Sequence, residues 1–189
     1  VTDPLGHTMS YSYSARGWLT TVADPLANQT DYSYDALGGL LSTTLSGQSS
    51  SPQSGGSNSY DNLHRLTLAV DPMTAETHIA YDAQGNPTTI TDAASHATAI
   101  LYEPDGLPQR VTDALSGQTA FVYRPTDRNL SSIANPLNKI TRLTYTAAGD
   151  VETATDPKGG VTTFAYDARG RLTEVRDAQN GITKYRYDA

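Results

Sequence analysis

The chain has 189 residues, of which 37% are hydrophobic, and its aromatic residues are 12 Tyr, 2 Phe and 1 Trp. Its net charge of −7 and isoelectric point near 4.9 argue against a nucleic-acid or anionic-membrane partner. It has no Cys to indicate a redox compartment, and it lacks the run of about 18 apolar residues that a membrane span needs.

Nine tyrosines recur along the chain at a nearly constant spacing. These anchor tyrosines are Tyr13, Tyr34, Tyr60, Tyr81, Tyr102, Tyr123, Tyr145, Tyr166 and Tyr187. Successive anchors are 21 residues apart, except for a spacing of 26 after Tyr34 and of 22 after Tyr123. A fixed period of about 20 residues is typical of repeat architectures. The sequence therefore predicts a single repeat array over residues 1–189.

Two turn signals flank each anchor tyrosine. The first, the Asp-Pro turn, begins ten residues before the anchor with an acid or Asn that Pro often follows: Asp3, Asp24, Asp71, Asp92, Asp113, Asn135, Asp156 and Asp177. The second, the anchor turn, has Gly four residues after the tyrosine: Gly17, Gly38, Gly85, Gly106, Gly149 and Gly170. Asp or Asn can accept a hydrogen bond from the backbone two residues on, and Gly supplies a left-handed conformation.

Between these turns lie short runs that alternate and are rich in β-branched residues, such as residues 162–166 and 172–176. They predict an all-β fold, an antiparallel meander of two strands per repeat that curls into a strip or shell wall. A three-residue loop after Tyr166 would place that side chain opposite Leu172. Because 21 is an odd number, each repeat then needs one even-length loop or one β-bulge to keep every anchor on one face. We expect this irregularity in or beside the Asp-Pro turn.

Two places depart from the period. Residues 46–57 are rich in Ser and Gly, and we expect a flexible loop insertion there, in which Gly55 would have no required conformation. Residues 123–130 are one residue longer than their counterparts. The extra residue is expected in the loop, since within a strand it would turn every following side chain to the other face.

The repeated text Y-D-x-x-G-x-L-T…D-P-x-G…T-x-x-Y-x-Y-D is best matched at residues 34–38, 81–85 and 166–170. It resembles the YD (tyrosine-aspartate) repeat of RHS-type proteins, of the C components of bacterial Tc toxins and of teneurins. The resemblance implies a hollow β-cocoon around a toxic C-terminal polypeptide, in a secreted or cell-surface protein. Its implied partners are the adjacent YD repeats of the same parent chain and the enclosed toxin. Both ends of the sequence fall inside a repeat, so we expect a fragment of a longer array.

The sequence predicts no catalytic residue, no metal site and no cofactor. The repeated Asp residues stand where turn chemistry already requires them, and His7, His64, His78 and His96 lack metal-ligand spacing. No serine lies in a nucleophile-elbow context. Trp18 replaces the small or charged residue that usually follows the turn Gly, and we expect it to pack on a neighbouring strand.

Two functions remain open from the sequence. The first is a non-enzymatic segment of a cocoon wall, in which the tyrosine rings pack between successive repeats. The alternative is a cell-surface module that binds glycans or a protein through an exposed, Tyr-rich face. In either case the unpaired edge strands of the isolated chain are expected to self-associate.

Overall fold

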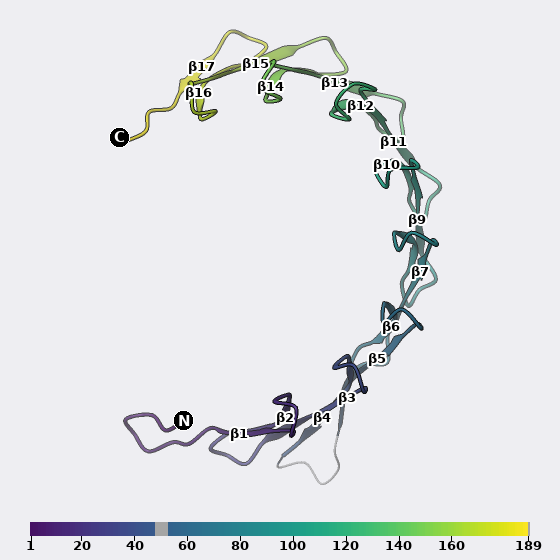
Figure 1. The fold of residues 1–189 in the computed structure, drawn as a ribbon, viewed down its shortest axis with the longest axis vertical. Helices are drawn as coiled ribbons and strands as arrows, with labels where there is room; N and C mark the ends of the chain where they lie inside the picture. The colour runs from purple at the N-terminus through teal and green to yellow at the C-terminus, as the bar shows by residue number, and fades with distance from the viewer. Residues whose placement is uncertain (48–52, 189) are drawn as a thin grey trace. The chain divides into compact units, whose positions relative to one another are not determined.

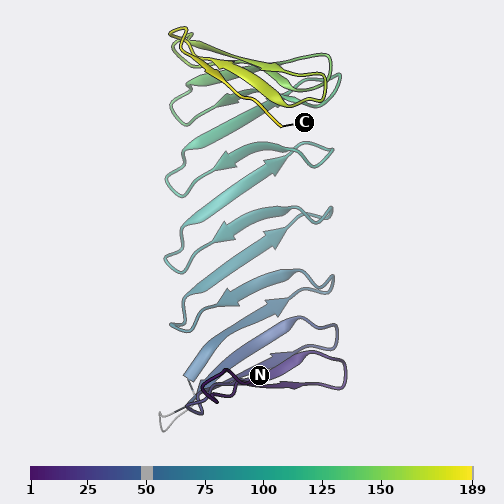
Figure 2. The same cartoon turned by 90° about the vertical axis from the view of Figure 1, so that its left-hand side faces the viewer.

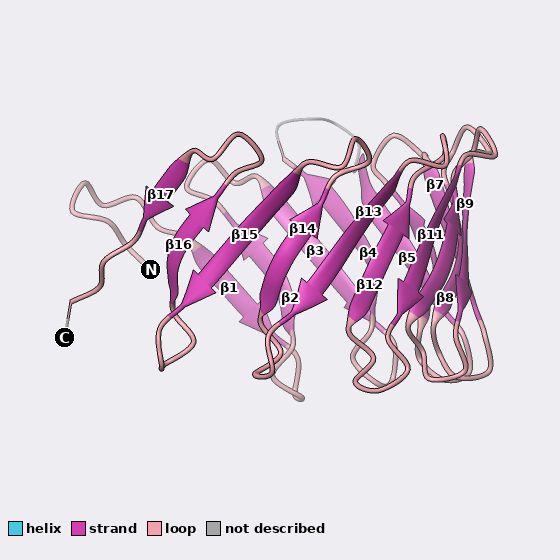
Figure 3. Cartoon of the chain, turned by 90° about the horizontal axis from the view of Figure 1, so that it is seen from above, coloured by secondary structure: helices cyan, strands magenta, loops and turns pink. Residues whose placement is uncertain are grey.

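The structure is a computed structural model that describes residues 1–47 and 53–188, and it forms two compact units, Val1–Ala97 and Thr98–Ala189. The described residues contain no helix and 17 strands, and within each unit the neighbouring strands pair antiparallel (Figures 1 and 3). The predicted all-β fold of repeated hairpins is confirmed. None of the described residues forms a helix long and apolar enough to cross a membrane.

The first unit contains eight strands, each paired with its neighbours along the chain. They are β1 (Ser10–Tyr13), β2 (Leu19–Ala23), β3 (Gln29–Tyr34), β4 (Leu40–Ser46), β5 (Gln53–Tyr60), β6 (Leu66–Val70), β7 (Glu76–Tyr81) and β8 (Pro87–Thr91). In the ribbon of Figure 2 the strands of this unit lie side by side, and tight turns at the two edges join β1 to β2, β2 to β3, β3 to β4, and each strand from β5 to β8 to the next.

The second unit repeats the pattern, beginning with a strand whose first residue still belongs to the first unit. Its strands are β9 (Ala97–Tyr102), β10 (Pro108–Thr112), β11 (Gln118–Tyr123), β12 (Leu130–Ala134), β13 (Ile140–Tyr145), β14 (Val151–Thr155), β15 (Val161–Tyr166), β16 (Leu172–Arg176) and β17 (Ile182–Lys184). Each pairs antiparallel with its neighbours within the unit. From β1 to β16, an odd-numbered strand therefore ends at an anchor tyrosine, and the even-numbered strand after it returns.

Each unit is a single layer of strands (Figure 1). No hydrophobic side chain among the described residues is fully buried. On β7, β9 and β15 half-buried and exposed residues alternate, as expected for side chains that point to opposite faces of a sheet. The anchor tyrosine lies on the half-buried face of each of these strands. Stability must therefore come from partly covered side chains, backbone hydrogen bonds and turns, because there is no closed core in the described residues.

Both kinds of turn have the same geometry. In the anchor turn, the amide of Asp167 donates to the carbonyl of Arg171 (2.9 Å) and that of Gly170 to the carbonyl of Asp167 (2.9 Å). In the Asp-Pro turn, the amide of Asp156 donates to the carbonyl of Gly160 in the same way, at 2.8 Å. Each of these turns is thus a three-residue loop whose last residue has a positive φ, the conformation expected for such hairpins.

The β-bulge required by the odd period is present, but its predicted place was wrong. Tyr166 pairs with Leu172 as expected, whereas the next pair is Ala165 with Glu174, so Thr173 is the extra residue. The Thr173 hydroxyl donates to the carbonyl of Ala165 (3.1 Å). The same shift lies beside the anchor in every odd-to-even hairpin within each unit. The Asp-Pro turn could not provide it, since its loop has three residues and preserves the facing of the strands.

The insertion after Tyr34 differs from the prediction at both ends. Ser46 was expected in the loop but ends β4, where it pairs with Gln29. Residues 53–57 were also expected there but belong to β5, which pairs with β4; the part at 48–52 lies outside the described residues. A Cβ atom on Gly55 would come within 2.9 Å of the Cβ of Thr43, so space restricts this position, although Gly55 does not have a positive φ.

The longer segment at residues 123–130 follows the prediction. The amide of Arg124 donates to the carbonyl of Asn129 (2.8 Å), and Tyr123 still pairs with Leu130. The extra residue is therefore accommodated in the loop, and the strands on either side keep their register.

Candidate functional site: the tyrosine ladder and the turn edges

The hydroxyl of an anchor tyrosine donates to the backbone of the preceding repeat. Tyr166 donates to the carbonyl of Val151 (2.9 Å), which is the residue that pairs with the preceding anchor, Tyr145. The other bonds of this type run from Tyr60 to Leu40, Tyr81 to Leu66, Tyr123 to Pro108, Tyr145 to Leu130 and Tyr187 to Leu172, at 2.8–3.1 Å. We call this series the tyrosine ladder. It joins each of these repeats to its N-terminal neighbour.

The ladder uses a carbonyl that lies beyond the regular strand pairing. On β16 the pairing with β17 begins at Glu174, and the amide of Tyr185 donates to the carbonyl of Thr173 (2.9 Å). The carbonyl of Leu172 lies one residue further out and accepts the Tyr187 hydroxyl. Burial raises the pKa of Tyr123 and of Tyr166, with the neighbouring charge of Asp150 adding to the effect at Tyr166. These phenols therefore stay protonated and remain donors.

The first repeats depart from the ladder. Among the described residues, the Tyr34 hydroxyl has no hydrogen bond, and its ring instead contacts Trp18, with ring centroids 5.5 Å apart. Trp18 also lies under the guanidinium of Arg16 (5.2 Å), and a Cβ on Gly38 would approach its ring to 3.0 Å. Trp18 thus packs on a neighbouring strand as predicted, in place of a tyrosine hydroxyl bond.

Arginines reinforce the same junctions at the anchor turns. Arg65 bonds the carboxylate of Asp61 in its own turn (2.7 Å) and the carbonyl of Asp82 in the next turn (3.1 Å), and its guanidinium lies 4.5 Å from the ring centroid of Tyr81. Arg171 makes the equivalent contacts with Asp167 and with Tyr187 (4.8 Å). This role was not predicted from the sequence, although Arg four residues after the turn Asp is a readable signal for it.

The seven Asp residues predicted to begin Asp-Pro turns all act as caps. One carboxylate oxygen accepts the amides two and four residues on, as Asp156 does from Lys158 (2.7 Å) and Gly160 (2.9 Å). The others, Asp3, Asp24, Asp71, Asp92, Asp113 and Asp177, make the same pair of bonds. The six predicted turn glycines all have positive φ, between 75° and 95°.

Hydrogen bonds to their carboxylates lower the pKa of several turn Asp residues. For Asp24 the side chain and backbone of Asn28 are the main causes, and for Asp167 the backbone and side chain of Arg171. These carboxylates are already used within their turns. Their chemistry is that of turn caps, as the sequence predicted.

The histidines bond single acids and do not converge. His7 and His96 each bond the Asp at the start of their own Asp-Pro turn, Asp3 (2.9 Å) and Asp92 (3.0 Å). His64 instead bonds Asp35 in a different turn (2.8 Å). Among the described residues there is no group of three or more His, Cys, Asp or Glu that could hold a metal ion.

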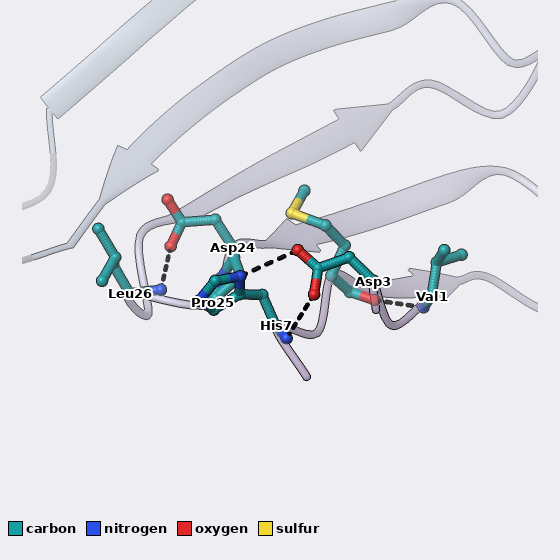
Figure 4. A pocket seen from close by; sticks show the side chains of 7 residues that line it. Val1, Asp3, His7, Asp24, Pro25 and Leu26 are labelled. Atoms are coloured by element: carbon teal, nitrogen blue, oxygen red, sulfur yellow. Dashed lines mark hydrogen bonds and ion pairs between the residues drawn. The ribbon is translucent and has the colours of Figure 1, made fainter. Parts of the chain in front are cut away.

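A cavity of about 550 Å³ lies between the first two Asp-Pro turns of the first unit (Figure 4). Its lining includes Asp3, His7, Met9, Asp24 and Leu26. The polar groups in its wall bond one another, since His7 bonds Asp3 and the Asp24 carboxylate accepts the amide of Leu26 (2.8 Å), as the dashed lines in Figure 4 show.

Comparisons with known proteins agree with this description. A family model for the RHS repeat matches residues 1–29, 13–49, 59–97, 145–182 and 166–189, which together exceed half of the chain. Comparison with curated proteins found no match.

Solved structures share the fold at low sequence identity. A crystal structure of TcdB2-TccC3-Cdc42 matches with a TM-score of 0.78 and 14% identity, covering 95% of this chain and 11% of that chain. A crystal structure of TcdB2-TccC3 gives a TM-score of 0.77 at 12% identity, with the same coverage. A structure of the Photorhabdus luminescens Tc holotoxin pore, with a mutation in TccC3, gives 0.57 at 17%, covering 94% and 9%. The chain thus spans about a tenth of the length of these structures.

The regular hairpins, the paired turn types and the tyrosine ladder define an antiparallel β-hairpin repeat protein. The chain belongs to the RHS repeat family.

Proposed function

We propose that this chain is a non-enzymatic segment of the wall of a β-hairpin shell, and that the longer protein containing it encloses a toxin polypeptide. Family membership and the fold shared with TcdB2-TccC3 support this proposal. The single-layer construction of each unit is also consistent with it, because a sheet that encloses space must be stable without a filled core. The toxin context would place the parent protein outside the producing cell or at its surface.

The tyrosine ladder is the observation that carries the proposal. A wall segment needs its tyrosines to bind one repeat to the next, whereas a glycan- or protein-binding face needs them free. Five of the six ladder tyrosines, all but the last, are half-buried, and each hydroxyl is bonded to the backbone. The alternative function, binding through an exposed Tyr-rich face, therefore finds little support.

The distribution of polar groups supports a role without catalysis. The turn carboxylates are occupied by backbone amides, and the wall of the cavity in Figure 4 is satisfied by its own bonds. We expect purified chain to show no hydrolase or transferase activity above that of a buffer blank.

Protease protection of the intact parent protein tests the shell function. We expect the enclosed polypeptide to survive added protease while the shell is intact and to be digested once the shell is unfolded. A polypeptide that the protease removes from an intact shell as fast as from an unfolded one would overturn the containment function and favour the binding module.

A further expectation concerns the isolated chain. In the part that the structure describes, β1 is paired only with β2 and β17 only with β16, so each has one open edge. Open edges recruit other strands, and we expect the chain to self-associate with rising concentration in sedimentation experiments. Proline at Lys184, whose amide faces the open edge of β17 because the amides of its neighbours face β16, should reduce this association, since Pro cannot donate to a strand ladder.

A further inference from the structure

The joint between β4 and β5 is unlike the other strand pairs of the first unit. β5 has the sequence QSGGSNSY, which contains no aliphatic side chain. Its pairing with β4 is interrupted by a register shift at Thr43 and Thr44, in addition to the shift beside the anchor tyrosine. Polar and Gly-rich strands pair weakly because they offer few side chains to pack across the pair. This joint is therefore a weak point of the sheet.

A histidine and an aspartate connect the two anchor turns on either side of this joint. His64 lies in the turn between β5 and β6, and Asp35 begins the turn between β3 and β4. The distance from His64 Nε2 to Asp35 Oδ2 is 2.8 Å, and the side chains are 33% and 24% exposed. This is the His–Asp contact in the described residues that joins different turns, since His7 and His96 bond within their own.

Three departures from the repeat assemble this contact. His64 occupies the left-handed position where most anchor turns have Gly, with φ of 62°. Its ring stacks on the anchor Tyr60, with centroids 4.9 Å apart and an interplanar angle of 22°. Gly39 leaves the space for it, because a Cβ there would lie 2.6 Å from His64 Nε2 and 2.9 Å from the Asp35 carboxylate. The stacking on Tyr60 and the space beside Gly39 together accommodate the imidazole ring of His64.

The other charged groups near His64 are already committed. In its own turn, Asp61 bonds the guanidinium of Arg65 (2.7 Å) and accepts the amides of Leu63 and Arg65. Burial raises the pKa of Asp35, but the amides of Gly39 and Leu37 and the His64 ring outweigh it and hold that pKa below the ordinary 3.8. Asp35 therefore stays charged over the range in which an imidazole titrates.

We propose that His64 and Asp35 form a pH-sensitive latch across the β4–β5 joint. A neutral imidazole with its proton on Nε2 donates one hydrogen bond to Asp35; protonation turns this into an ion pair. The ion pair is the stronger contact, so acidification tightens the joint and a rise in pH loosens it.

Amide hydrogen exchange of the full chain tests the latch. Protection factors, which remove the intrinsic effect of pH on exchange, are measured for amides of β4 and β5 at about pH 7.5 and about pH 5.5. We expect them to rise about two- to fivefold on acidification, the range for a partly exposed ion pair. His64→Asn should abolish the rise, because Asn tolerates the left-handed conformation but cannot be protonated.

Two further variants make the test specific. Asp35→Asn should also abolish the rise while keeping the turn cap, since Asn135 caps its own turn with the same pair of amides. Asp92→Asn removes the charge of the group that bonds His96 within a single turn and should leave the rise in β4 and β5 unchanged. The latch is refuted if the wild-type factors do not rise, or if they rise equally in the His64→Asn variant, which keeps Asp35 and its cap.

Discussion

At the scale of single residues, each hairpin depends on one left-handed position. The anchor turns mostly fill it with Gly, whereas the Asp-Pro turns mostly do not. The non-glycine residues at this position in Asp-Pro turns are Ala27, Thr74, Ser95, Ser116, Asn138 and Asn180, with φ between 56° and 66°. A side chain with a Cβ is strained there, and a β-branched one most of all. The two edges of the sheet therefore carry different amounts of backbone strain.

At this left-handed position, replacing Gly by a β-branched residue should destabilise the fold, and replacing a β-branched residue by Asn should stabilise it. Gly170 has φ of 75°, and no neighbouring atom lies within 4 Å of where a Cβ would stand, so Gly170→Val should cost about 1–3 kcal/mol through strain alone. Thr74→Asn should stabilise by about 0.5–1 kcal/mol, because Asn tolerates the left-handed region and already occupies it at Asn138. Denaturant unfolding measures both. Gly170→Asn is the control, and a loss equal to that of Val would contradict the role of φ.

Gly55 is required for a different reason, namely space. A side chain there would press against Thr43, whose backbone carbonyl carbon lies 3.3 Å from the Cβ position. Gly55→Val should therefore destabilise the chain by about 1–3 kcal/mol, as overpacking usually does. Ser57→Val, at an exposed position of the same strand, should change the unfolding midpoint little. Equal effects of the two substitutions would show that β5 does not lie against β4 as described.

At the scale of the hairpin, the bulge and the tyrosine hydroxyl act together. The bulge beside the anchor restores the facing of the strands. The carbonyl just before the bulge residue accepts the next tyrosine hydroxyl, as Leu172 does from Tyr187. This arrangement explains why Leu-Thr recurs in the repeat sequence. The Leu carbonyl accepts the tyrosine hydroxyl, and Thr occupies the bulge, where the hydroxyls of Thr67 and Thr173 donate to a carbonyl of the preceding strand.

Removing one phenolic hydroxyl tests the ladder. Tyr166→Phe leaves the carbonyl of Val151 without its donor and should cost about 1 kcal/mol in the free energy of unfolding. Tyr34→Phe is a matched control, because the Tyr34 hydroxyl has no hydrogen bond in the described residues and its ring contact with Trp18 survives. A loss in the Tyr34 variant as large as in the Tyr166 variant would argue that the hydroxyls act through solvation alone.

Local features of the sequence predicted the hairpins well. Asp and Gly fix each turn within five residues, and the pairing of Tyr166 with Leu172 followed from the loop length. The position of the bulge could not be predicted, because an extra residue at either end of a strand keeps every anchor tyrosine on the same face of the sheet. The extension of β5 was missed because Ser and Gly carry no strand pattern. The contact of His64 with Asp35 joins residues 29 positions apart, which no local rule connects.

At the scale of the whole molecule, the turn carboxylates make stability depend on pH. Hydrogen bonds lower the pKa of eight Asp residues below the ordinary 3.8: Asp3, Asp24, Asp35, Asp61, Asp82, Asp92, Asp105 and Asp167. A carboxyl with a lowered pKa stabilises the fold above its unfolded pKa, and this contribution is lost as the pH falls through the folded value. The turn caps therefore stabilise the fold at neutral pH, and this stabilisation is lost in acid.

We expect the midpoint of denaturant unfolding to fall steeply below about pH 4 and to change much less between about pH 5 and pH 8. Asp167→Asn should weaken this acid dependence, since Asn keeps an acceptor oxygen for the turn but does not titrate. An acid dependence as steep in the variant as in the wild type would mean that Asp167 contributes nothing to it.

The tyrosine ladder also gives the chain a direction. Every ladder hydroxyl donates toward the N-terminal neighbour, as from Tyr187 to β16 and from Tyr166 to β14. During synthesis on the ribosome, the acceptor carbonyl has therefore already been made when its tyrosine is added. Each new hairpin can dock onto finished structure and need not wait for a distant segment. Growth at the C-terminal end adds a complete junction at every step, whereas removal of an N-terminal repeat would leave a phenol without its acceptor.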